Sequence, residues 1–340
     1  MSRRLTDRQK ARIGRLQERR RARVDRTAAA LTEGGLGPEQ HGLVLTHYGQ
    51  SSIIEDDAGQ LHRCAARQNL GPLACGDRVV WQASGVGDGV VVAVGERRSL
   101  LTRPDHNGQP RPIAANLDAV AVVLAPTPEP SEYLLDRYLV AIAATGARGL
   151  LVLNKIDLLD PPALAAMVER MEPYRRIGYP LLPASSRAAR GLDALRDWLS
   201  GRASLLVGQS GVGKSSLIKA LLPDRDIRIQ AVSAATGHGT HTTSASTLYH
   251  LPGGGDLIDT PGVRSFELGD VRPDDLERGF PELTPYLGCC RFADCRHETE
   301  PDCALRDAVA GGAVAPRRLE SYRRLRAELE LALKPGRSPS

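Results

Sequence analysis

One glycine-rich segment constrains the fold of this chain more than any other feature. In "ASLLVGQSGVGKSSLIKALL", residues 203–222, an apolar run leads into Gly208-x4-Gly213-Lys214-Ser215, and a helix-like stretch follows. Glycines allow a tight turn that points backbone N–H groups at phosphate oxygens, and the following helix adds its N-terminal dipole. The lysine can bridge the terminal phosphates of a nucleotide, and the serine after it can bind Mg²⁺. We therefore predict a phosphate-binding loop made of Gly208, Gln209, Ser210, Gly211, Val212, Gly213, Lys214, Ser215 and Ser216, with Ser215 on Mg²⁺.

Short apolar runs and helix-like stretches alternate around this loop. The runs at 117–126, 149–154 and 254–260 are continuously apolar, as in strands that are buried on both faces. Stretches with helical character separate them. Buried strands that alternate with helices predict an α/β domain with a largely parallel sheet, which we place at residues 112–272.

Two segments downstream of the loop are suited to contact Mg²⁺ and the γ-phosphate. In "GGDLIDTPGV", Asp259 ends an apolar strand and can hold Mg²⁺ through water, and the N–H of Gly262 can contact the γ-phosphate. The segment "TGHGTHTTSAS" has the composition of a mobile loop that brings a Thr hydroxyl to Mg²⁺. We assign Mg²⁺ to Thr243, with Thr242 as the alternative, and a plain solvent loop is the other interpretation.

A possible base-reading loop precedes the phosphate-binding loop by some fifty residues: Asn154-Lys155-Ile156-Asp157 follows an apolar run. The carboxylate of Asp157 can accept hydrogen bonds from the ring N–H and the exocyclic amine of guanine, a pair of donors that adenine lacks. Asn154 can bond the other base edge, and the stem of Lys155 can cover the ring. Taken alone, the tetrapeptide could be a helix start capped by Asp157. Beside a phosphate-binding loop it predicts a site for GTP and GDP, which Ser185 and Ser186 at the end of a later strand would support.

The segment before the α/β domain has a different pattern. Residues 36–103 consist of short β-rich runs broken by Gly and Asp, without a helical period. Such a pattern predicts a small barrel, and the length suits five strands of the OB type. A link that contains Pro and Asn, "TRPDHNGQPRPIAAN", follows the barrel.

Positive charge is concentrated in an N-terminal arm, residues 1–35. Residues 1–26 hold eleven Lys and Arg against three Asp and Glu, a net charge of +8, which leaves −3 of the total +5 for the rest of the chain. This asymmetry favours a polyanionic partner such as RNA, although a solvated Arg-rich helix or a targeting segment would look similar. No run approaches the roughly eighteen apolar residues of a membrane span, and the N-terminus lacks the apolar segment of a signal peptide. We expect a cytoplasmic protein without a membrane partner.

Four cysteines gather near the C-terminus beside a histidine. Cys290-x4-Cys295-x-His297-x5-Cys303 provides three thiolates and an imidazole within fourteen positions. Three soft sulfurs and one nitrogen suit tetrahedral Zn²⁺, and four protein ligands leave no open position, so we predict one structural zinc in a domain at residues 273–340. Cys289 could replace Cys290, and a redox cluster is the alternative to a metal site.

Five segments typical of GTPases occur in this chain in a circularly permuted order. From the N-terminus they are the base-reading loop, its supporting loop, the phosphate-binding loop, the Thr-rich segment and Asp-x-x-Gly. Over about residues 41–334 the chain resembles the ribosome small subunit-dependent GTPase A family, through "RRSLLTR", "NKIDLL", "GQSGVGKSSL", "GTHTT", "DTPGVRSF" and "CRFADCRH". The resemblance implies a multidomain protein: an N-terminal OB-type barrel, a central circularly permuted P-loop GTPase and a mostly helical C-terminal zinc-binding domain. It also implies GTP hydrolysis that the small ribosomal subunit stimulates, a role in late maturation of that subunit and contact with its rRNA. The family pattern favours Cys290 over Cys289, but Thr240 stands where relatives usually carry a basic residue.

The catalytic group is less well determined by the sequence. Val263 follows Asp-x-x-Gly, where Ras-like GTPases often place a Gln that orients the attacking water. Valine cannot hydrogen-bond water, so we expect slow intrinsic hydrolysis, with His241 as the candidate catalytic group and a structural or RNA contact as its alternative role.

Two other functions compete with this interpretation. The first is an RNA-binding adaptor that uses GTP only as a structural or regulatory ligand, and the intact Lys214, Ser215 and Asp259 argue against it. The second is a metabolic GTPase or kinase with a small acceptor, and the barrel and the basic arm argue against that one. We expect a monomer.

Overall fold

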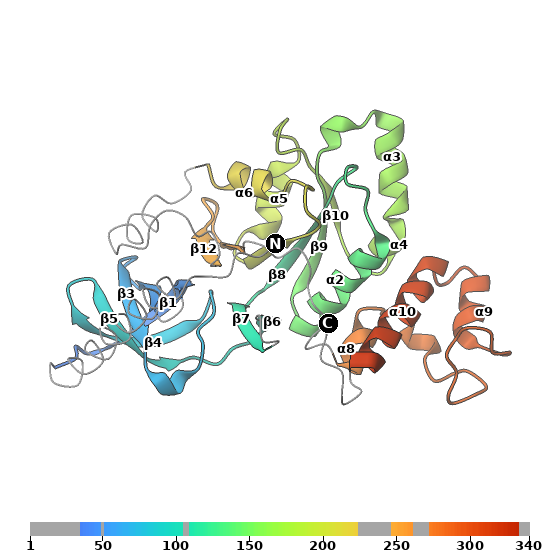
Figure 1. The fold of residues 1–340 in the computed structure, drawn as a ribbon. Coiled ribbons are helices and arrows are strands. Elements are labelled where there is room, and N and C mark those ends of the chain that lie inside the picture. Colours follow the sequence, from blue (N-terminus) through green and yellow to red (C-terminus); the bar gives the residue numbers. More distant parts are fainter. Residues whose placement is uncertain (1–34, 49–50, 105–108, 224–245, 261–271, 333–340) are drawn as a thin grey trace, which may run out of the picture.

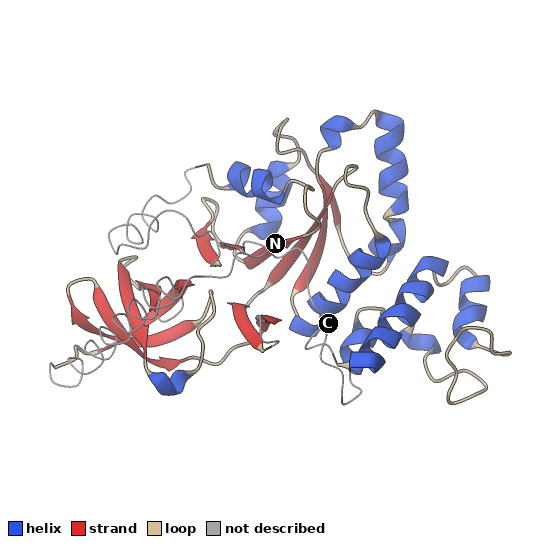
Figure 2. Ribbon diagram, in the orientation of Figure 1, coloured by secondary structure: helices blue, strands red, loops and turns tan. Residues whose placement is uncertain are grey.

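The computed structural model describes residues 35–48, 51–104, 109–223, 246–260 and 272–332. Figure 1 shows three bodies side by side, with a β-barrel at one end, an α/β domain in the middle and a helical domain at the other end. Strands make up the first body and helices the last, and only the central body combines the two in layers (Figure 2). The predicted multidomain fold is confirmed.

The N-terminal body is a closed five-stranded barrel. Its strands are β1 (Glu39–Tyr48), β2 (Ser51–Asp56), β3 (Leu61–Ala66), β4 (Arg78–Gly85) and β5 (Asp88–Val94), with a 3-10 helix at Gln68–Leu70. β1 pairs with both β2 and β4, β2 pairs with β3, and β5 pairs with β3 and β4, so the sheet closes on itself. Trp81 fills the interior, and Gly89 makes room for it, because a Cβ there would lie 2.5 Å from the indole ring.

A two-stranded hairpin joins the barrel to the α/β domain. β6 (Leu100–Pro104) pairs with β7 (Pro110–Ala115) in the segment where the sequence analysis expected only a link. The strands escape recognition because their sequences, LLTRP and PRPIAA, contain Pro, which is rare inside strands. The barrel packs closely on this hairpin: the N–H of Ala115 donates to the carbonyl oxygen of Cys75 over 2.8 Å, and a Cβ on Gly76 would lie 2.5 Å from the carbonyl oxygen of Ala115.

The central sheet runs in the order β10-β9-β8-β11-β13-β12. Its strands are β8 (Ala119–Leu124), β9 (Arg148–Leu153), β10 (Leu181–Pro183), β11 (Ala203–Val207), β12 (Thr247–His250) and β13 (Asp256–Asp259). All are parallel except β12, which is antiparallel to β13. β12 also pairs with β1 of the barrel, where Thr46 lies opposite Thr247, so the two bodies share one continuous sheet.

A histidine reinforces this junction between barrel and sheet. His250, at the end of β12, forms ion pairs with Asp256 of β13 over 2.6 Å and with Glu55 of β2 over 2.7 Å. The hydrogen bond with Asp256 is the main cause that raises the pKa of His250 to about 9, and the bond with Glu55 adds to it. The imidazolium therefore links strands of two domains at neutral pH.

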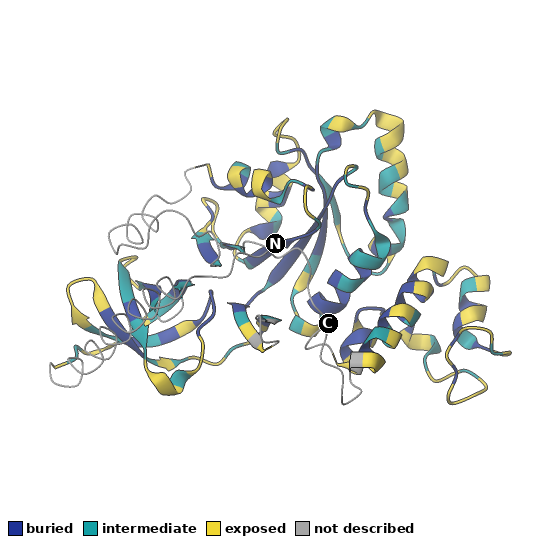
Figure 3. Cartoon of the chain, in the orientation of Figure 1, coloured by how far each residue is buried: buried dark blue, intermediate teal, exposed yellow. Residues whose placement is uncertain are grey.

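Helices cover both faces of the central sheet. They are α2 (Glu132–Thr145), α3 (Pro161–Arg170), α4 (Glu172–Arg176), α5 (Leu192–Leu199) and α6 (Lys214–Leu221), with a 3-10 helix at Ile156–Leu158. Along β8, Val120 and Val122 pack on the side of α2 and α4, and Ala121 and Val123 pack on the side of α5 and α6. The central residues of β8, β9, β11 and β13 are buried, whereas α3 and α5 expose their outer sides (Figure 3). Burial on both faces explains the continuous apolar runs in the sequence.

The C-terminal body packs on α2. It comprises α8 (Pro273–Arg278), α9 (Ala304–Ala310) and α10 (Pro316–Ala332), with a 3-10 helix at Thr284–Tyr286. Its apolar core includes Phe280, Leu283 and Leu325, and it also takes in Val140 of α2. A Cβ on Gly279 would lie 2.5 Å from the Val140 side chain, so glycine permits the close approach of the two domains.

Candidate functional site

The glycine-rich loop lies between the carboxyl end of β11 and the start of α6, in the middle of the sheet (Figure 1). Gly208, Gly211 and Gly213 have φ angles of 142°, 84° and 94°, which residues with side chains rarely adopt. A Cβ on Gly208 would also lie 2.3 Å from the carbonyl oxygen of Val123. The backbone geometry therefore requires the glycines that the motif contains.

The polar side chains of this loop are arranged around its turn. The ammonium group of Lys214, the first residue of α6, donates to the carbonyl oxygens of Gly208 over 2.6 Å and Gln209 over 2.7 Å. Among the other predicted contacts, Ser210, Ser215 and Ser216 are exposed, and Val212 is buried. The serines of the loop are therefore accessible to a ligand, while Val212 packs into the core and fixes the loop to the domain.

The predicted base-reading loop is tied directly to the phosphate-binding loop. Asn154 is fully buried; its Nδ2 donates to the carbonyl oxygen of Val212 over 2.9 Å, and its Oδ1 accepts from the N–H of Ser186 over 3.3 Å. The hydroxyl of Ser185 donates to Asp157 over 2.5 Å, and this bond is the main cause that lowers the pKa of Asp157. Asn154 thus joins three loops, a role that the sequence analysis did not assign to it.

A fourth loop, residues 125–131 after β8, borders the same place. Lys155, whose φ is 62°, donates from its ammonium group to the carbonyl oxygens of Gly211 over 2.5 Å and Thr127 over 2.9 Å. Pro128 lies beside Gly211, since a Cβ on that glycine would be 3.5 Å from Pro128 Cδ. The 125–131 loop was not predicted from the sequence. Its Pro-rich composition directly after a buried strand was the available signal.

The parallel arrangement brings these loops to one edge of the sheet, where ligands of open α/β sheets bind. Asp259 is the last residue of β13, which pairs with β11, and so it ends at the same edge as the phosphate-binding loop. Six further residues of the sequence analysis lie outside the described part of the chain: Thr240, His241, Thr242, Thr243, Gly262 and Val263.

The four predicted metal ligands lie together in the C-terminal domain. The ligand atoms of Cys290, Cys295, His297 and Cys303 are all within 4.8 Å of one another. His297 Nδ1 is 3.4 Å from the sulfurs of both Cys290 and Cys303, which are 3.9 Å apart. Tetrahedral Zn²⁺ has bonds of about 2.3 Å to sulfur and about 2.0 Å to nitrogen. This geometry requires about 3.5 Å between a nitrogen and a sulfur ligand and about 3.8 Å between two sulfur ligands. The cluster fits a zinc ion in donor type and spacing, and it could hold one.

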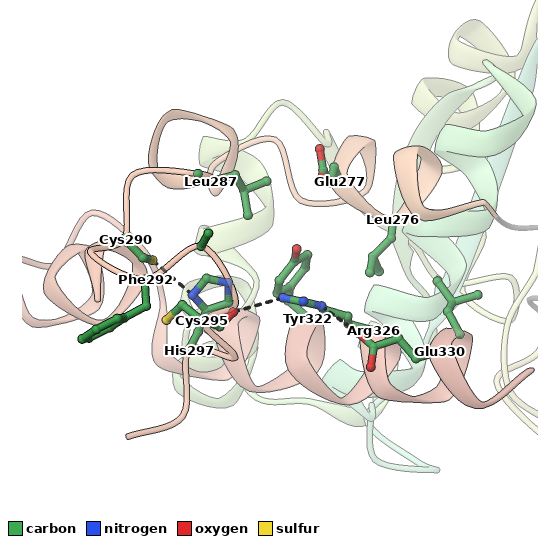
Figure 4. A pocket seen from close by; sticks show the side chains of 13 residues that line it. Leu276, Glu277, Leu287, Cys290, Phe292, Cys295, His297, Tyr322, Arg326 and Glu330 are labelled. Carbon is green, nitrogen blue, oxygen red and sulfur yellow. Dashed lines mark hydrogen bonds and ion pairs between the residues drawn. The ribbon is translucent and has the colours of Figure 1, made fainter. Parts of the chain in front are cut away.

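Cys289 lies apart from this cluster. It is exposed, and its thiol is directed at the carbonyl oxygens of Pro285 and Leu287. A hollow of about 390 Å³ is lined by Cys290, Cys295 and His297 together with Tyr322 and Arg326 of α10. Figure 4 shows these side chains.

The comparison with known proteins agrees with this geometry. Residues 94–269, which include both nucleotide-binding motifs, match the family model described as RsgA GTPase. The chain belongs to the RsgA GTPase family. Two relatives are the small ribosomal subunit biogenesis GTPases RsgA of Azotobacter vinelandii, 50% identical over 335 residues, and of Pseudomonas aeruginosa strain PAO1, 48% identical over 331 residues. Each alignment covers 96% of this chain and 98% of the relative.

Two solved structures resemble most of the chain in fold. The crystal structure of YjeQ from Thermotoga maritima matches with a TM-score of 0.70 and 32% identity, covering 88% of this chain and all of that one. YloQ, described as a circularly permuted GTPase, matches with a TM-score of 0.66 and 29% identity, covering 88% of this chain and 98% of that one. The family resemblance seen in the motifs is confirmed, and this RsgA family member is a GTPase. Within its described segments, none of the helices combines the length and apolarity that a membrane crossing demands.

Proposed function

We propose that this chain binds the small ribosomal subunit, acts in its late maturation and hydrolyses GTP to GDP and phosphate when the subunit stimulates it. One observation carries the proposal: Asn154 and Lys155 of the base-reading loop donate hydrogen bonds to backbone carbonyl oxygens of the phosphate-binding loop. Relatives named for small ribosomal subunit biogenesis align over nearly the whole chain and supply the partner. Contact with rRNA is supported by the net charge of +8 on residues 1–26. We propose that the protein acts as a cytoplasmic monomer.

The assignment of residues to the nucleotide follows the loop geometry. Backbone N–H groups of residues 208–216 bind the phosphates, and Lys214 turns from its present carbonyl partners to the terminal phosphates. Asp157, held by Ser185, reads guanine beside Ser186, with Asn154 and Lys155 completing the wall of the site. Ser215, Thr243 or Thr242, and Asp259 would hold Mg²⁺, which neutralises phosphate charge, and Gly262 would contact the γ-phosphate.

We propose that His241 assists the attacking water, because Val263 cannot. The test is turnover of His241→Ala with small subunits present. A fall in turnover with unchanged GTP affinity supports the role. Unchanged turnover at normal affinity removes His241 from the mechanism.

We propose one structural zinc on Cys290, Cys295, His297 and Cys303, supported by their spacing. Cys289 is the exposed thiol, whereas Cys64 and Cys75 are buried in and beside the barrel, where burial raises their pKa values. A thiol reagent should therefore label Cys289 quickly in the native protein and label the three cluster cysteines only after zinc is chelated. Rapid labelling of all four before chelation, or no stoichiometric zinc in metal analysis, would rule out the site.

The decisive experiment for the proposed function is GTP turnover by the full chain, alone and with purified small or large ribosomal subunits, with ATP as the control nucleotide. The proposal expects slow GTP hydrolysis that small subunits accelerate and large subunits do not. Binding to small subunits without acceleration would favour an RNA-binding adaptor. Turnover that depends on a small-molecule acceptor would favour a metabolic enzyme.

A further inference from the structure

The C-terminal domain is fixed to α2 by a buried ion-pair cluster. Arg318 of α10, with 3% of its side chain exposed, donates to Asp136 of α2 over 2.6 Å and to Glu282 over 2.6 Å. Its guanidinium also lies over the rings of Phe280 and Tyr174 at 4.1 and 5.4 Å. The cluster therefore joins α10 to α2 through buried charged contacts.

A second set of ion pairs runs along the surface of this interface toward the start of α2. Arg317, the neighbour of the buried arginine, donates to Glu132 of α2 over 2.5 Å. The same carboxylate oxygen accepts from Arg170 at the end of α3 over 2.6 Å. Burial by itself would raise the pKa of Glu132, but the hydrogen bond from Arg170, a backbone hydrogen bond and the charges of Arg170 and Arg317 together outweigh it, and the pKa lies below its usual value. The ionised Glu132 is therefore a junction between the C-terminal domain and α3.

Arg170 continues this chain of contacts into the 125–131 loop. Besides Glu132, its guanidinium donates to Glu129 over 2.8 Å and to the carbonyl oxygen of Pro130 over 3.0 Å. The same loop accepts from Lys155 at Thr127, and Lys155 in turn holds the phosphate-binding loop. An unbroken series of contacts thus leads from α10 to both nucleotide-binding loops.

We propose that Arg317 and Arg170 are positioning residues for the nucleotide site, which act through Glu132 on the 125–131 loop and thereby on Lys155. The C-terminal domain then contributes to guanine nucleotide affinity without touching the nucleotide. The inference rests on the proposed nucleotide site.

The test measures the dissociation constant of a fluorescent GDP analogue for the full chain carrying Arg317→Gln, Glu132→Gln, or both. Arg317 is 67% exposed on its side chain, so its loss leaves the fold intact. An exposed ion pair corresponds to an effect of up to about fivefold, so each single variant should weaken GDP binding by roughly two- to fivefold. The double variant should be no weaker than Glu132→Gln alone, because both substitutions break the same contact.

Two controls separate positioning from general destabilisation. Arg306→Gln removes an exposed arginine of the same domain that donates to the carbonyl oxygen of Glu300, and it should leave GDP affinity unchanged. Arg317→Lys keeps the charge and should restore most of the affinity. In about 1 M salt, where screening acts within about 3 Å, the difference between wild type and Arg317→Gln should shrink.

The outcomes distinguish this inference from the proposed function. If wild type binds no GDP, the proposed nucleotide site is wrong. If wild type binds GDP and Arg317→Gln binds it equally well at low salt, the positioning role is wrong and the nucleotide site stands. Equal weakening by Arg317→Gln and Arg306→Gln would also overturn the positioning role, since it would mark a non-specific charge effect.

Discussion

Replacing Arg318 with methionine should release α10 from the GTPase domain. Methionine keeps most of the apolar stem, so the substitution mainly removes the charge. It leaves Asp136, whose side chain is fully buried, without its cation, and the carbonyl oxygen of Gly279 without the donor that now lies at 2.8 Å. Burial works against both charges: it raises the pKa of Asp136, but for Arg318 the contacts with Asp136 and Glu282 outweigh it and hold the pKa of the guanidinium above its usual value. The 2.6 Å contact between Arg318 and Asp136 is therefore a charge pair that depends on both partners. Removing one partner of such a pair costs about 3–5 kcal/mol.

Hydrogen exchange of the α10 amides measures this loss locally, which avoids assuming that a multidomain chain unfolds in one step. A cost of 3 kcal/mol or more corresponds to exchange that is faster by about a hundredfold. The double variant Arg318→Met, Asp136→Asn should exchange more slowly than the single variant, because it no longer buries an unpaired carboxylate. Arg306→Met, a substitution of an exposed arginine in the same domain, should change exchange by less than about fivefold. Exchange in Arg318→Met within fivefold of wild type would refute the buried-pair reasoning.

Two further predictions concern the nucleotide loops and the barrel junction. Gly213→Ala should weaken GDP binding by at least tenfold, on the order of 1.4 kcal/mol, because the added Cβ would lie 2.4 Å from Asn154 Nδ2. Gly178 has a similar positive φ but open space around it, so Gly178→Ala should leave GDP binding unchanged. A fluorescence titration measures both affinities. His250→Gln should lower the free energy of unfolding by less than about 1 kcal/mol at pH 6.5 and below, since the side chain is 47% exposed. Because the folded pKa of His250 is raised to about 9, the difference should disappear as the pH rises through that value, and a constant difference in denaturant titrations from pH 6 to 10 would contradict the ion-pair explanation.

The sequence predicted those features that depend on spacing within a short segment. The glycines of the phosphate-binding loop, the Asn154–Asp157 tetrapeptide and the Cys290–Cys303 ligands are local patterns whose chemistry restricts their geometry, and the structure brings each set together. The parallel sheet was predictable because strands buried on both faces are continuously apolar.

Contacts between distant segments were not predictable in the same way. Arg318 and Asp136 are 182 positions apart, and each alone resembles an ordinary surface charge on a helix. Nothing in the sequence around Glu55 or His250 indicates that the two face each other, because their proximity follows from the pairing of β1 with β12. The 125–131 loop was overlooked for a related reason: its Pro-rich composition indicates a loop after β8, but the residues that its carbonyls contact, Lys155 and Arg170, lie far along the chain.

The central claim is that a base-reading loop and a phosphate-binding loop, in permuted order along the chain, form one guanine nucleotide site. Asp157→Asn tests it most directly. Guanine offers a ring N–H and an amine to the carboxylate, whereas xanthine carries a carbonyl in place of the amine and needs an amide donor. Wild type should bind GTP far more tightly than XTP, and Asp157→Asn should reverse that preference, with a loss of GTP affinity of about a hundredfold or more. Unchanged GTP affinity in Asp157→Asn, measured in the same titration, would contradict the account.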